Sequence, residues 1–234
     1  MARKSTSQET QPEATPDRPV PLFRRPTRED ALALARSTYD AGERVDVQTL
    51  AWQLGLSRAT LHRWFGTREQ LLSDVLDQLI AEFVDAAHAQ AVGQGNERVF
   101  DFIRRLMELT FGFEPSRVFI RREPELALRL ALSEGGAVHR RVAEGVQRVL
   151  VETRPPTEAQ GLDGFTETIV QVGTALEWAT FSIGDEPRIE RTIEIARALL
   201  ESSATAKPAT VSRAAESRRA ANARRSAPAG RRAR

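Results

Sequence analysis

Apolar side chains recur at intervals of three and four residues along most of the chain between about residues 27 and 203. This spacing gathers them on one face of an α-helix, whereas a half-buried strand would need strict alternation of apolar and polar residues. The sequence shows no such alternation and no internal repeat. The pattern therefore predicts an all-α protein of about nine helices.

The first four predicted helices are segments with clear start and stop signals. Each follows a polar residue that is suited to cap a helix N-terminus: Thr27, Asp46, Ser57 and Thr67. Gln70, three residues after Thr67, completes a capping box for the fourth helix, which we expect to run to about Ala91. The first three helices are closed by glycines: Gly42, Gly55 and Gly66. The apolar stripe of the first helix is predicted to be Ala31, Leu34, Ala35 and Thr38.

Further helices follow a glycine-rich break at "GQG". We expect Asn96 to cap the next helix and Asp185 to cap the last one, which should end near Leu200. The other helical segments are ERVFDFIRRLMELTFGF, RVFIRR, ELALRLAL, AVHRRVAEGVQRVLVET and FTETIVQVGTALEWATFSI.

Charge is distributed unevenly along the chain. Residues 204–234 hold nine basic residues and one acidic residue, a net charge of +8, and residues 1–26 carry +2. Because the whole chain is only +2, residues 27–203 carry −8. An acidic body is not typical of a general nucleic-acid binder, so any contact with DNA must come from a local patch or from the basic tail.

The amino-acid composition excludes several kinds of site and of protein. Cysteine is absent, which excludes disulfides, thiolate metal sites and thiol nucleophiles and fits a cytoplasmic protein. No apolar run approaches the ~20 residues that cross a bilayer, and the N-terminus does not resemble a signal peptide. We therefore expect no membrane partner.

The stretch "LGLSRATLHRWFGTREQLL", residues 54–72, predicts a helix-turn-helix. Its leucines and Phe65 supply a small core, and its basic and hydroxyl side chains remain on the surface. A recognition helix in the major groove needs donors at its N-terminal end, where Arg58 can reach a guanine edge and Thr60 a thymine methyl or a phosphate. The candidate DNA-binding residues are Arg44, Thr49, Ser57, Arg58, Ala59, Thr60, His62, Arg63, Trp64 and Arg68. The alternative is a solvated helical hairpin with ordinary surface arginines.

This stretch resembles the signature of TetR-type transcriptional regulators over about residues 28–75. The matching residues are Gly55, Ser57, Thr60, Leu61, Phe65, Arg68 and Leu71. His62 stands where the family usually has a tyrosine that touches a phosphate, and Arg68 replaces the usual lysine at the start of helix four. The segments "FIRREPELALRLALSEGG" and "IGDEPRIERTIEIARALL" resemble the QsdR-type branch, whose members repress genes for degrading quorum-sensing lactones.

The resemblance implies a dimeric, ligand-responsive repressor that binds a palindromic operator in double-stranded DNA. It divides the chain into a disordered N-terminal extension (1–26), a DNA-binding domain (27–72), an effector-binding and dimerisation domain (73–202) and a disordered basic tail (203–234). Effector binding would shift helix four and change the separation of the two recognition helices. The tail is either a non-specific DNA-binding arm or a tolerated extension.

Candidate effector residues lie on the helices after residue 75, which carry aromatic side chains, few histidines and no cysteine. They are Phe100, Ile103, Met107, Phe111, Phe119, Arg122 and Trp178. The apolar side chains are more often plain core than pocket lining, Arg122 is more often part of a solvated corner between helices, and Trp178 can face either the pocket or a partner subunit. The mix favours an organic, largely apolar effector. The QsdR-like resemblance narrows the effector to a lactone, with Arg122 or Trp178 as hydrogen-bond donor to its carbonyl.

Apolar stripes on the last two helices predict a four-helix dimer interface. They comprise Ile169, Val172, Leu176, Ile183, Ile189, Ile193, Ala196 and Leu200. Gly173, Ala175 and Ala179 would allow the helices to approach closely.

An enzyme or a metal-binding bundle with an accidental helix-turn-helix pattern is the alternative from another class. Asp85 and His88 could place two ligands on one helical face, but a di-metal bundle needs further carboxylates and a second such pair. No nucleophile motif or phosphate-binding loop is present. We therefore expect no catalytic residues, no metal and no cofactor. A nearer alternative is a DNA-binding protein that responds to no ligand.

Overall fold

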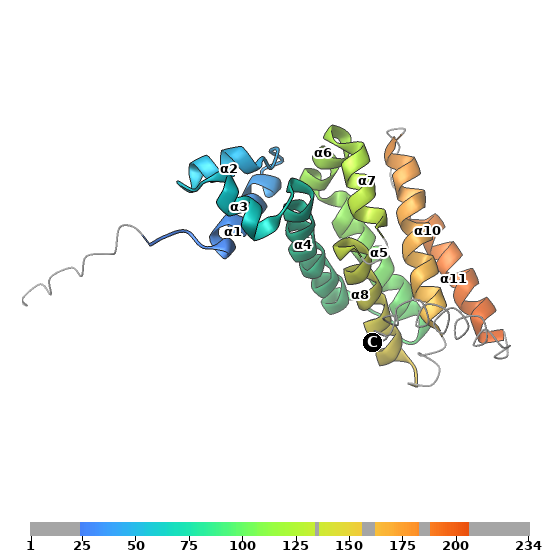
Figure 1. Cartoon of the computed structure of the whole chain (residues 1–234). Helices are drawn as coiled ribbons and strands as arrows, with labels where there is room; N and C mark the ends of the chain where they lie inside the picture. The colour runs from blue at the N-terminus through green and yellow to red at the C-terminus, as the bar shows by residue number, and fades with distance from the viewer. Residues whose placement is uncertain (1–23, 134–135, 156–161, 183–187, 206–234) are drawn as a thin grey trace, which may run out of the picture.

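The computed structural model describes residues 24–133, 136–155, 162–182 and 188–205, which form ten α-helices and no strand (Figure 1). This confirms the all-α prediction. The helices are α1 (Arg28–Asp40), α2 (Val47–Gln53), α3 (Arg58–Phe65), α4 (Arg68–Gln90), α5 (Asn96–Gly112), α6 (Glu114–Arg122), α7 (Pro124–Leu132), α8 (Ala137–Thr153), α10 (Asp163–Ser182) and α11 (Ile189–Thr205).

The four N-terminal helix starts lie where the sequence predicts them. Thr27, Asp46, Ser57 and Thr67 are the N-caps, and each side chain accepts a hydrogen bond from a backbone N–H of the first turn. The capping box with Gln70 is present. Gly66 ends α3 at a φ of +70°, and a side chain there would collide with the Oε1 of Gln70. Both the turn and the capping box therefore favour glycine.

The start of α5 differs from the prediction. Its N-cap is Gly95, and Asn96 is the first helical residue. The side-chain oxygen of Asn96 accepts a hydrogen bond from Arg154 instead of capping the helix. The predicted cap Asp185, like the predicted N-terminal extension as far as residue 23 and the tail beyond residue 205, lies outside the described residues.

A first hydrophobic core joins α1, α2, α3 and the first half of α4. Leu50, Leu61 and Phe65 are buried in it. The buried residues of α1 are Ala31, Leu32, Ala35 and Tyr39, whereas Leu34 and Thr38, expected in the stripe, are only half-buried. Because α4 is one continuous helix, the predicted domain boundary at residue 72 falls inside it, and its residues as far as Leu79 belong to this first core.

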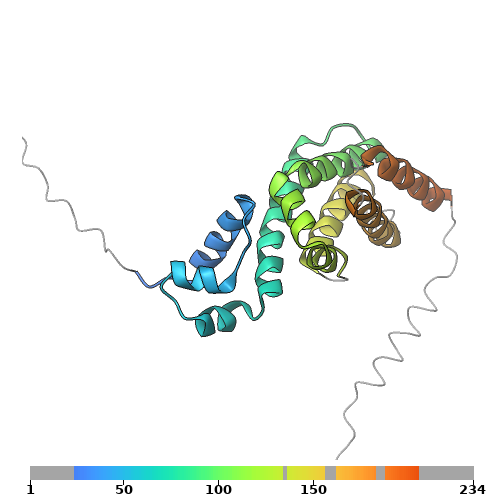
Figure 2. The same cartoon turned by 90° about the horizontal axis from the view of Figure 1, so that it is seen from above.

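A second core is formed by the rest of α4 with α5, α8, α10 and α11. Gly145 on α8 permits its closest packing, because a Cβ atom there would lie 2.8 Å from Val84 on α4 and 2.9 Å from Phe102 on α5. Figures 1 and 2 show α1–α3 at one end of the molecule and α10–α11 at the other, with α4 running between them. Helix α4 is thus shared by both cores.

Ion pairs connect the outer faces of α4 and α8. Asp77 accepts hydrogen bonds from Arg140 and Arg141, each at 2.8 Å. Asp85 pairs with Arg148, and His88 pairs with Glu152. Asp85 and His88 therefore have separate partners, and the described residues contain no cluster that could hold a metal ion.

The predicted dimerisation stripe requires correction. Ile169, Ile193, Ala196 and Leu200 are at most 4% exposed and pack in the second core of the same protomer. The apolar spacing of α10 and α11 therefore reflects packing against α5 and α8, and these four side chains have no surface left for a partner. Val172, Leu176 and Ile189 are half-buried, and Ile183 lies outside the described residues.

Candidate DNA-binding surface and effector pocket

Helix α3 presents its N-terminal end and one full face to solvent. Its cap Ser57 accepts a hydrogen bond from the backbone N–H of Thr60 at 3.1 Å, which fixes the first turn. Ser57, Arg58, Ala59, His62 and Arg63 are exposed, while Leu61 and Phe65 hold the opposite face in the core. This is the arrangement that a groove-reading helix requires.

The two arginines of α3 are unusual in lacking partners. Most described arginines are in ion pairs, but Arg58 and Arg63 make no hydrogen bond or ion pair with any part of the chain whose position is described. The sequence from Val47 to Gly66 contains no Asp or Glu, so no neighbouring carboxylate on α2 or α3 can neutralise them. The result is a local positive surface on a protein whose body is acidic.

Four other predicted DNA contacts differ in exposure and in partners. Arg44 and Thr49 are exposed, although Arg44 also lies 3.6 Å from Glu123. The ring Nδ1 of His62 is engaged with the carbonyl of Gly66, so only its other nitrogen faces outward. Trp64 is half-buried and packs against the first core, where it supports α3.

Arg68 does not have the environment of a phosphate-binding residue. Its Nη1 and Nη2 each donate to Glu123 at 2.6 Å, and its Nε donates to the carbonyl of Val45. Its side chain is 21% exposed. Every nitrogen of the guanidinium is therefore engaged inside the protein, where Arg68, a predicted DNA contact, links α4 to the α6–α7 corner.

Trp52 on α2 was not among the residues predicted to bind DNA. Its side chain is 81% exposed, the largest value among the exposed large hydrophobic residues of the described chain. It lies on the acid-free α2–α3 segment. Its signal in the sequence is an aromatic residue on the polar face of a short helix.

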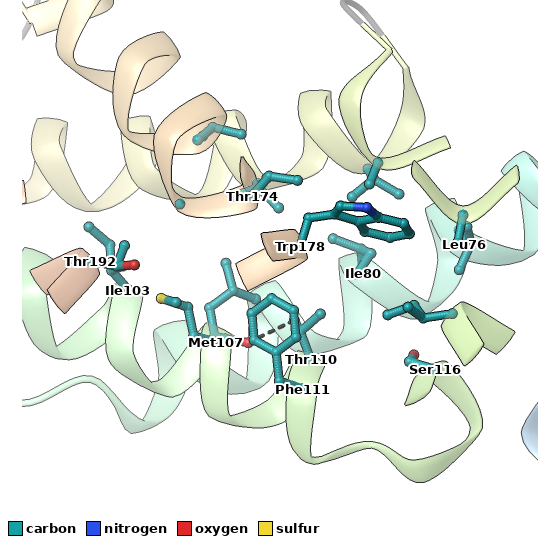
Figure 3. A pocket seen from close by; sticks show the side chains of 18 of the residues that line it. Leu76, Ile80, Ile103, Met107, Thr110, Phe111, Ser116, Thr174, Trp178 and Thr192 are labelled. Carbon is teal, nitrogen blue, oxygen red and sulfur yellow. Dashed lines mark hydrogen bonds between the residues drawn. The ribbon is translucent and has the colours of Figure 1, made fainter. Parts of the chain in front are cut away.

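A large apolar pocket lies within the C-terminal helices (Figure 3). Its empty volume is about 1070 Å³, which includes space open to solvent. Helices α4, α5, α6, α7, α8, α10 and α11 all contribute to its wall, and α1 contributes Tyr39. None of its described lining residues carries a charge.

Five of the seven predicted effector residues line this pocket. They are Ile103, Met107, Phe111, Phe119 and Trp178. Phe100 is instead 1% exposed in the second core, where the Arg197 guanidinium stacks over its ring at 4.5 Å. Arg122 is exposed and lies beside Glu123, outside the pocket, so it cannot orient an effector there.

The polar groups of the pocket are mostly hydroxyls, and none of these was predicted. Tyr39 donates its hydroxyl to Ser116 at 3.2 Å, and its ring packs edge-on against Phe119. Burial raises the pKa of Tyr39 to about 12, so the phenol is neutral at physiological pH. Thr110 donates to the carbonyl of Leu106 at 2.7 Å. Thr174 and Thr192 also line the wall.

Helix α6 is linked to α1 near its start and to α4 just after its end. Near its start, Ser116 accepts the hydrogen bond from Tyr39 of α1. Just after its end, Glu123 holds Arg68 of α4. Hydrogen bonds and charge from Arg68 lower the pKa of Glu123, with a smaller contribution from Arg44, so this carboxylate is ionised at neutral pH. The same helix lines the pocket through Phe119 and Ile120.

A known protein family and solved structures are similar to this chain. Residues 94–201 match the family model described as "Tetracyclin repressor-like, C-terminal domain". Among solved structures, the transcriptional repressor QsdR of the TetR family from R. erythropolis is similar with 29% sequence identity and a TM-score of 0.67. That match covers 74% of this chain and 94% of the QsdR chain.

A second solved structure is less similar. The TetR family transcriptional regulator PfmR from Thermus thermophilus has 21% identity and a TM-score of 0.35 over 78% of this chain and 97% of its own. A search of curated proteins gave no match. No helix among the described residues is both long and apolar enough to span a bilayer. Residues 94–201 thus match a tetracyclin repressor-like C-terminal domain, and the all-helical fold with its N-terminal helix-turn-helix is similar to that of a TetR-family repressor.

Proposed function

We propose that this protein is a ligand-responsive transcriptional repressor that binds a palindromic operator as a homodimer and leaves it when a small, uncharged, largely apolar effector fills the pocket. One observation carries the proposal. A pocket without charged residues is walled in part by Tyr39, a residue of the DNA-binding helices. A ligand in that pocket therefore contacts both functional halves of the chain.

DNA binding is assigned to the exposed end of α3. Arg58, at the first helical position, is the candidate base reader, because an arginine there can donate two hydrogen bonds to guanine. Arg63 and the outer nitrogen of His62 are candidates for phosphate contacts, which position the helix without reading sequence. Arg44, Thr49, Ser57, Ala59 and Thr60 complete the proposed surface, and Trp52 extends it along α2.

The dimer is assigned to the outer faces of α10 and α11, which lie farthest from α1–α3 (Figure 2). Thr168, Gln171 and Ala175 are exposed on α10, and Ala198 is exposed on α11. Half-buried Val172 and Ile195 flank these small side chains. This surface replaces the buried stripe predicted from the sequence, and two-fold pairing across it would set two recognition helices on successive turns of DNA, about 34–36 Å apart.

Effector release is assigned to α6. A ligand that pushes on Phe119 or Ile120 acts on a helix held to α1 by Ser116 and followed by Glu123, which holds α4. A shift of α6 would move the start of α4 and alter the separation of the two recognition helices. A tenfold loss of operator affinity requires only ~1.4 kcal/mol of coupling between the two sites.

The likeness to QsdR supports a place in the QsdR-type branch and an effector of lactone type. A lactone is uncharged, and the pocket offers only hydroxyl groups, backbone and an indole as polar partners. As a regulator of transcription, the protein would act in the cytoplasm, where bacterial DNA lies.

The test has two steps. The full-length protein first selects its operator from random duplexes, which should yield a palindrome whose binding depends steeply on salt. Mobility shifts with that operator are then titrated with γ-lactones and acyl-homoserine lactones of increasing chain length. We expect release that strengthens with chain length. Selection of no preferred sequence would refute the repressor assignment, and release by charged ligands but by none of the lactones would refute the effector class.

A further inference from the structure

Thr192 on α11 carries a buried hydroxyl that the fold leaves without a partner. Its side chain lines the pocket and is 1% exposed, and its Oγ1 makes no hydrogen bond with any described residue. A buried hydroxyl that is left without a hydrogen-bond partner is destabilising. Such a group in a pocket wall indicates a position that a ligand atom completes.

Other helical threonines of this chain show what Thr192 lacks. The hydroxyls of Thr38, Thr110, Thr153 and Thr168 each donate to the carbonyl four residues earlier, at 2.6 to 2.8 Å. The corresponding carbonyl for Thr192 belongs to Arg188, which accepts the backbone N–H groups of Arg191 and Thr192 but not the Thr192 hydroxyl. The hydroxyl of Thr192 is therefore not used by its own helix.

Neighbouring packing explains this orientation. Gly173 of α10 lies against the methyl group of Thr192, since a Cβ at residue 173 would stand 3.3 Å from Cγ2. The methyl branch is thus directed at α10, and the hydroxyl takes another branch of the Cβ. Figure 3 shows Thr192 at one side of the cavity beside Ile103, with its oxygen turned toward the interior.

The other buried polar position lies at the opposite side of the same cavity. Figure 3 places Ser116 far from Thr192, with Ile80, Met107 and Trp178 between them. Ser116 already accepts a hydrogen bond from the Tyr39 hydroxyl, so its side chain, unlike that of Thr192, has a partner. Thr192 is therefore the buried hydroxyl of this wall that makes no hydrogen bond among the described residues. The wall also carries the half-buried Thr174 and the indole of Trp178, and its other side chains between Thr192 and Ser116 are largely apolar.

We propose that the Thr192 hydroxyl is the donor that orients the effector, which is an uncharged molecule with a hydrogen-bond acceptor at its head and an apolar chain extending toward Ser116. A carboxylate head does not fit, because no cation lines the pocket to offset the loss of its hydration. This inference rests on the proposed effector function and assigns the residue that sets its specificity.

The experiment compares two probes of similar shape on the full-length protein. γ-Nonalactone has a five-membered ring with a carbonyl and a pentyl chain, and pentylcyclopentane has the same ring and chain without oxygen. Their dissociation constants are measured by displacement of Nile red, a neutral dye, from wild type, Thr192→Val, Thr192→Ser and Thr110→Val. Thr110 is the matched control because it lines the same pocket but its hydroxyl donates a hydrogen bond to the carbonyl of Leu106.

We expect Thr192→Val to weaken γ-nonalactone about tenfold, the effect of one neutral hydrogen bond, and to leave pentylcyclopentane unchanged or bound more tightly. Thr192→Ser should retain lactone affinity within about threefold, and Thr110→Val should retain it for both probes. Without any probe, Thr192→Val should raise Tm by roughly 2–4 °C, because a methyl group replaces an unsatisfied hydroxyl.

The outcomes separate this inference from the function on which it rests. If both probes bind wild type but Thr192→Val and Thr110→Val affect the lactone equally, the assignment of Thr192 is wrong while the apolar effector site stands. If neither probe binds wild type, the effector class fails and the assignment of Thr192 fails with it. A Tm lowered by Thr192→Val would show that the hydroxyl is satisfied inside the protein.

Discussion

Replacing Glu123 with glutamine should weaken the connection between the pocket and the DNA-binding helices and reduce stability by a measurable amount. The carboxylate accepts two hydrogen bonds from Arg68 at 2.6 Å, and the two side chains are only 17% and 21% exposed. Hydrogen bonds to charged groups contribute ~1.5–3 kcal/mol each. Glutamine keeps one acceptor oxygen, and the desolvation of the pair offsets part of the gain. The expected loss in the free energy of unfolding is therefore ~2 kcal/mol at pH 7.

At acid pH the difference in the free energy of unfolding between wild type and Glu123→Gln should disappear. The pKa of Glu123 is lowered from 4.5 in the folded protein, chiefly by Arg68. A carboxyl with a depressed folded pKa stabilises fully above its unfolded pKa and loses that contribution as the pH falls through the folded value. Wild type should thus lose stability relative to Glu123→Gln below pH 4.5. The free energies of unfolding of the two proteins should converge there.

Urea unfolding at equal protomer concentration measures both effects, since the stability of a dimer depends on concentration. Glu114→Gln is the matched control, because Glu114 pairs with Arg121 on the same helix but in an exposed position. Its loss should stay below ~1 kcal/mol. If Glu123→Gln lowers the free energy of unfolding no more than Glu114→Gln does, the Arg68–Glu123 ion pair does not stabilise the fold as inferred. A loss that stays constant from pH 7 to below pH 4.5 would contradict the same inference.

Three further predictions concern other parts of the molecule. Arg58→Ala should cost ~1–3 kcal/mol of operator binding and relax preference at one base pair, measured by fluorescence anisotropy; equal losses on operator and random DNA would exclude base reading. Ala175→Arg should produce a monomer at micromolar concentration in sedimentation velocity, whereas removal of residues 206–234 should leave the dimer intact; a dimeric Ala175→Arg protein would place the interface elsewhere. Gly145→Val should lower the free energy of unfolding by ~1–3 kcal/mol through overpacking against Val84 and Phe102. Gly112→Ala, where no atom lies within 4 Å of the new Cβ, should cost nothing and serves as its control.

Local signals in the sequence were sufficient for the elements at the N-terminus. Thr27, Asp46, Ser57 and Thr67 cap helices because their side chains bond to backbone groups only three residues away. Such interactions depend on adjacent residues, so they can be inferred without knowing the fold. Asn96 shows the limit of this inference, because Arg154, 58 residues later, engages the same side chain.

Choices of partner among distant residues could not be inferred in this way. Arg68 matches the family signature and was predicted to contact DNA, but in this chain its guanidinium is held by the carboxylate of Glu123. The apolar spacing of α10 and α11 indicated two buried faces without indicating whether the same protomer or a second one buries them. Ile193 and Leu200 show that the same protomer does. Of the aromatic effector candidates, Phe111, Phe119 and Trp178 line the cavity and Phe100 lies in the core, because a cavity wall and a core are built from the same residue types.

The presence of Tyr39 in the pocket wall affects how far the proposed regulator can be treated as two exchangeable modules. Biosensors are commonly built by joining the DNA-binding helices of one regulator to the effector domain of another at a single junction. In this protein such a junction anywhere after α1 replaces part of the pocket, because Tyr39 lies on α1, one of the helices proposed to form the DNA-binding part. A functional chimera must therefore carry a tyrosine at this position, or a partner for Ser116 of equal reach, whichever operator it is designed to recognise. Changes in operator preference that repack α1 would likewise alter which effectors the protein detects.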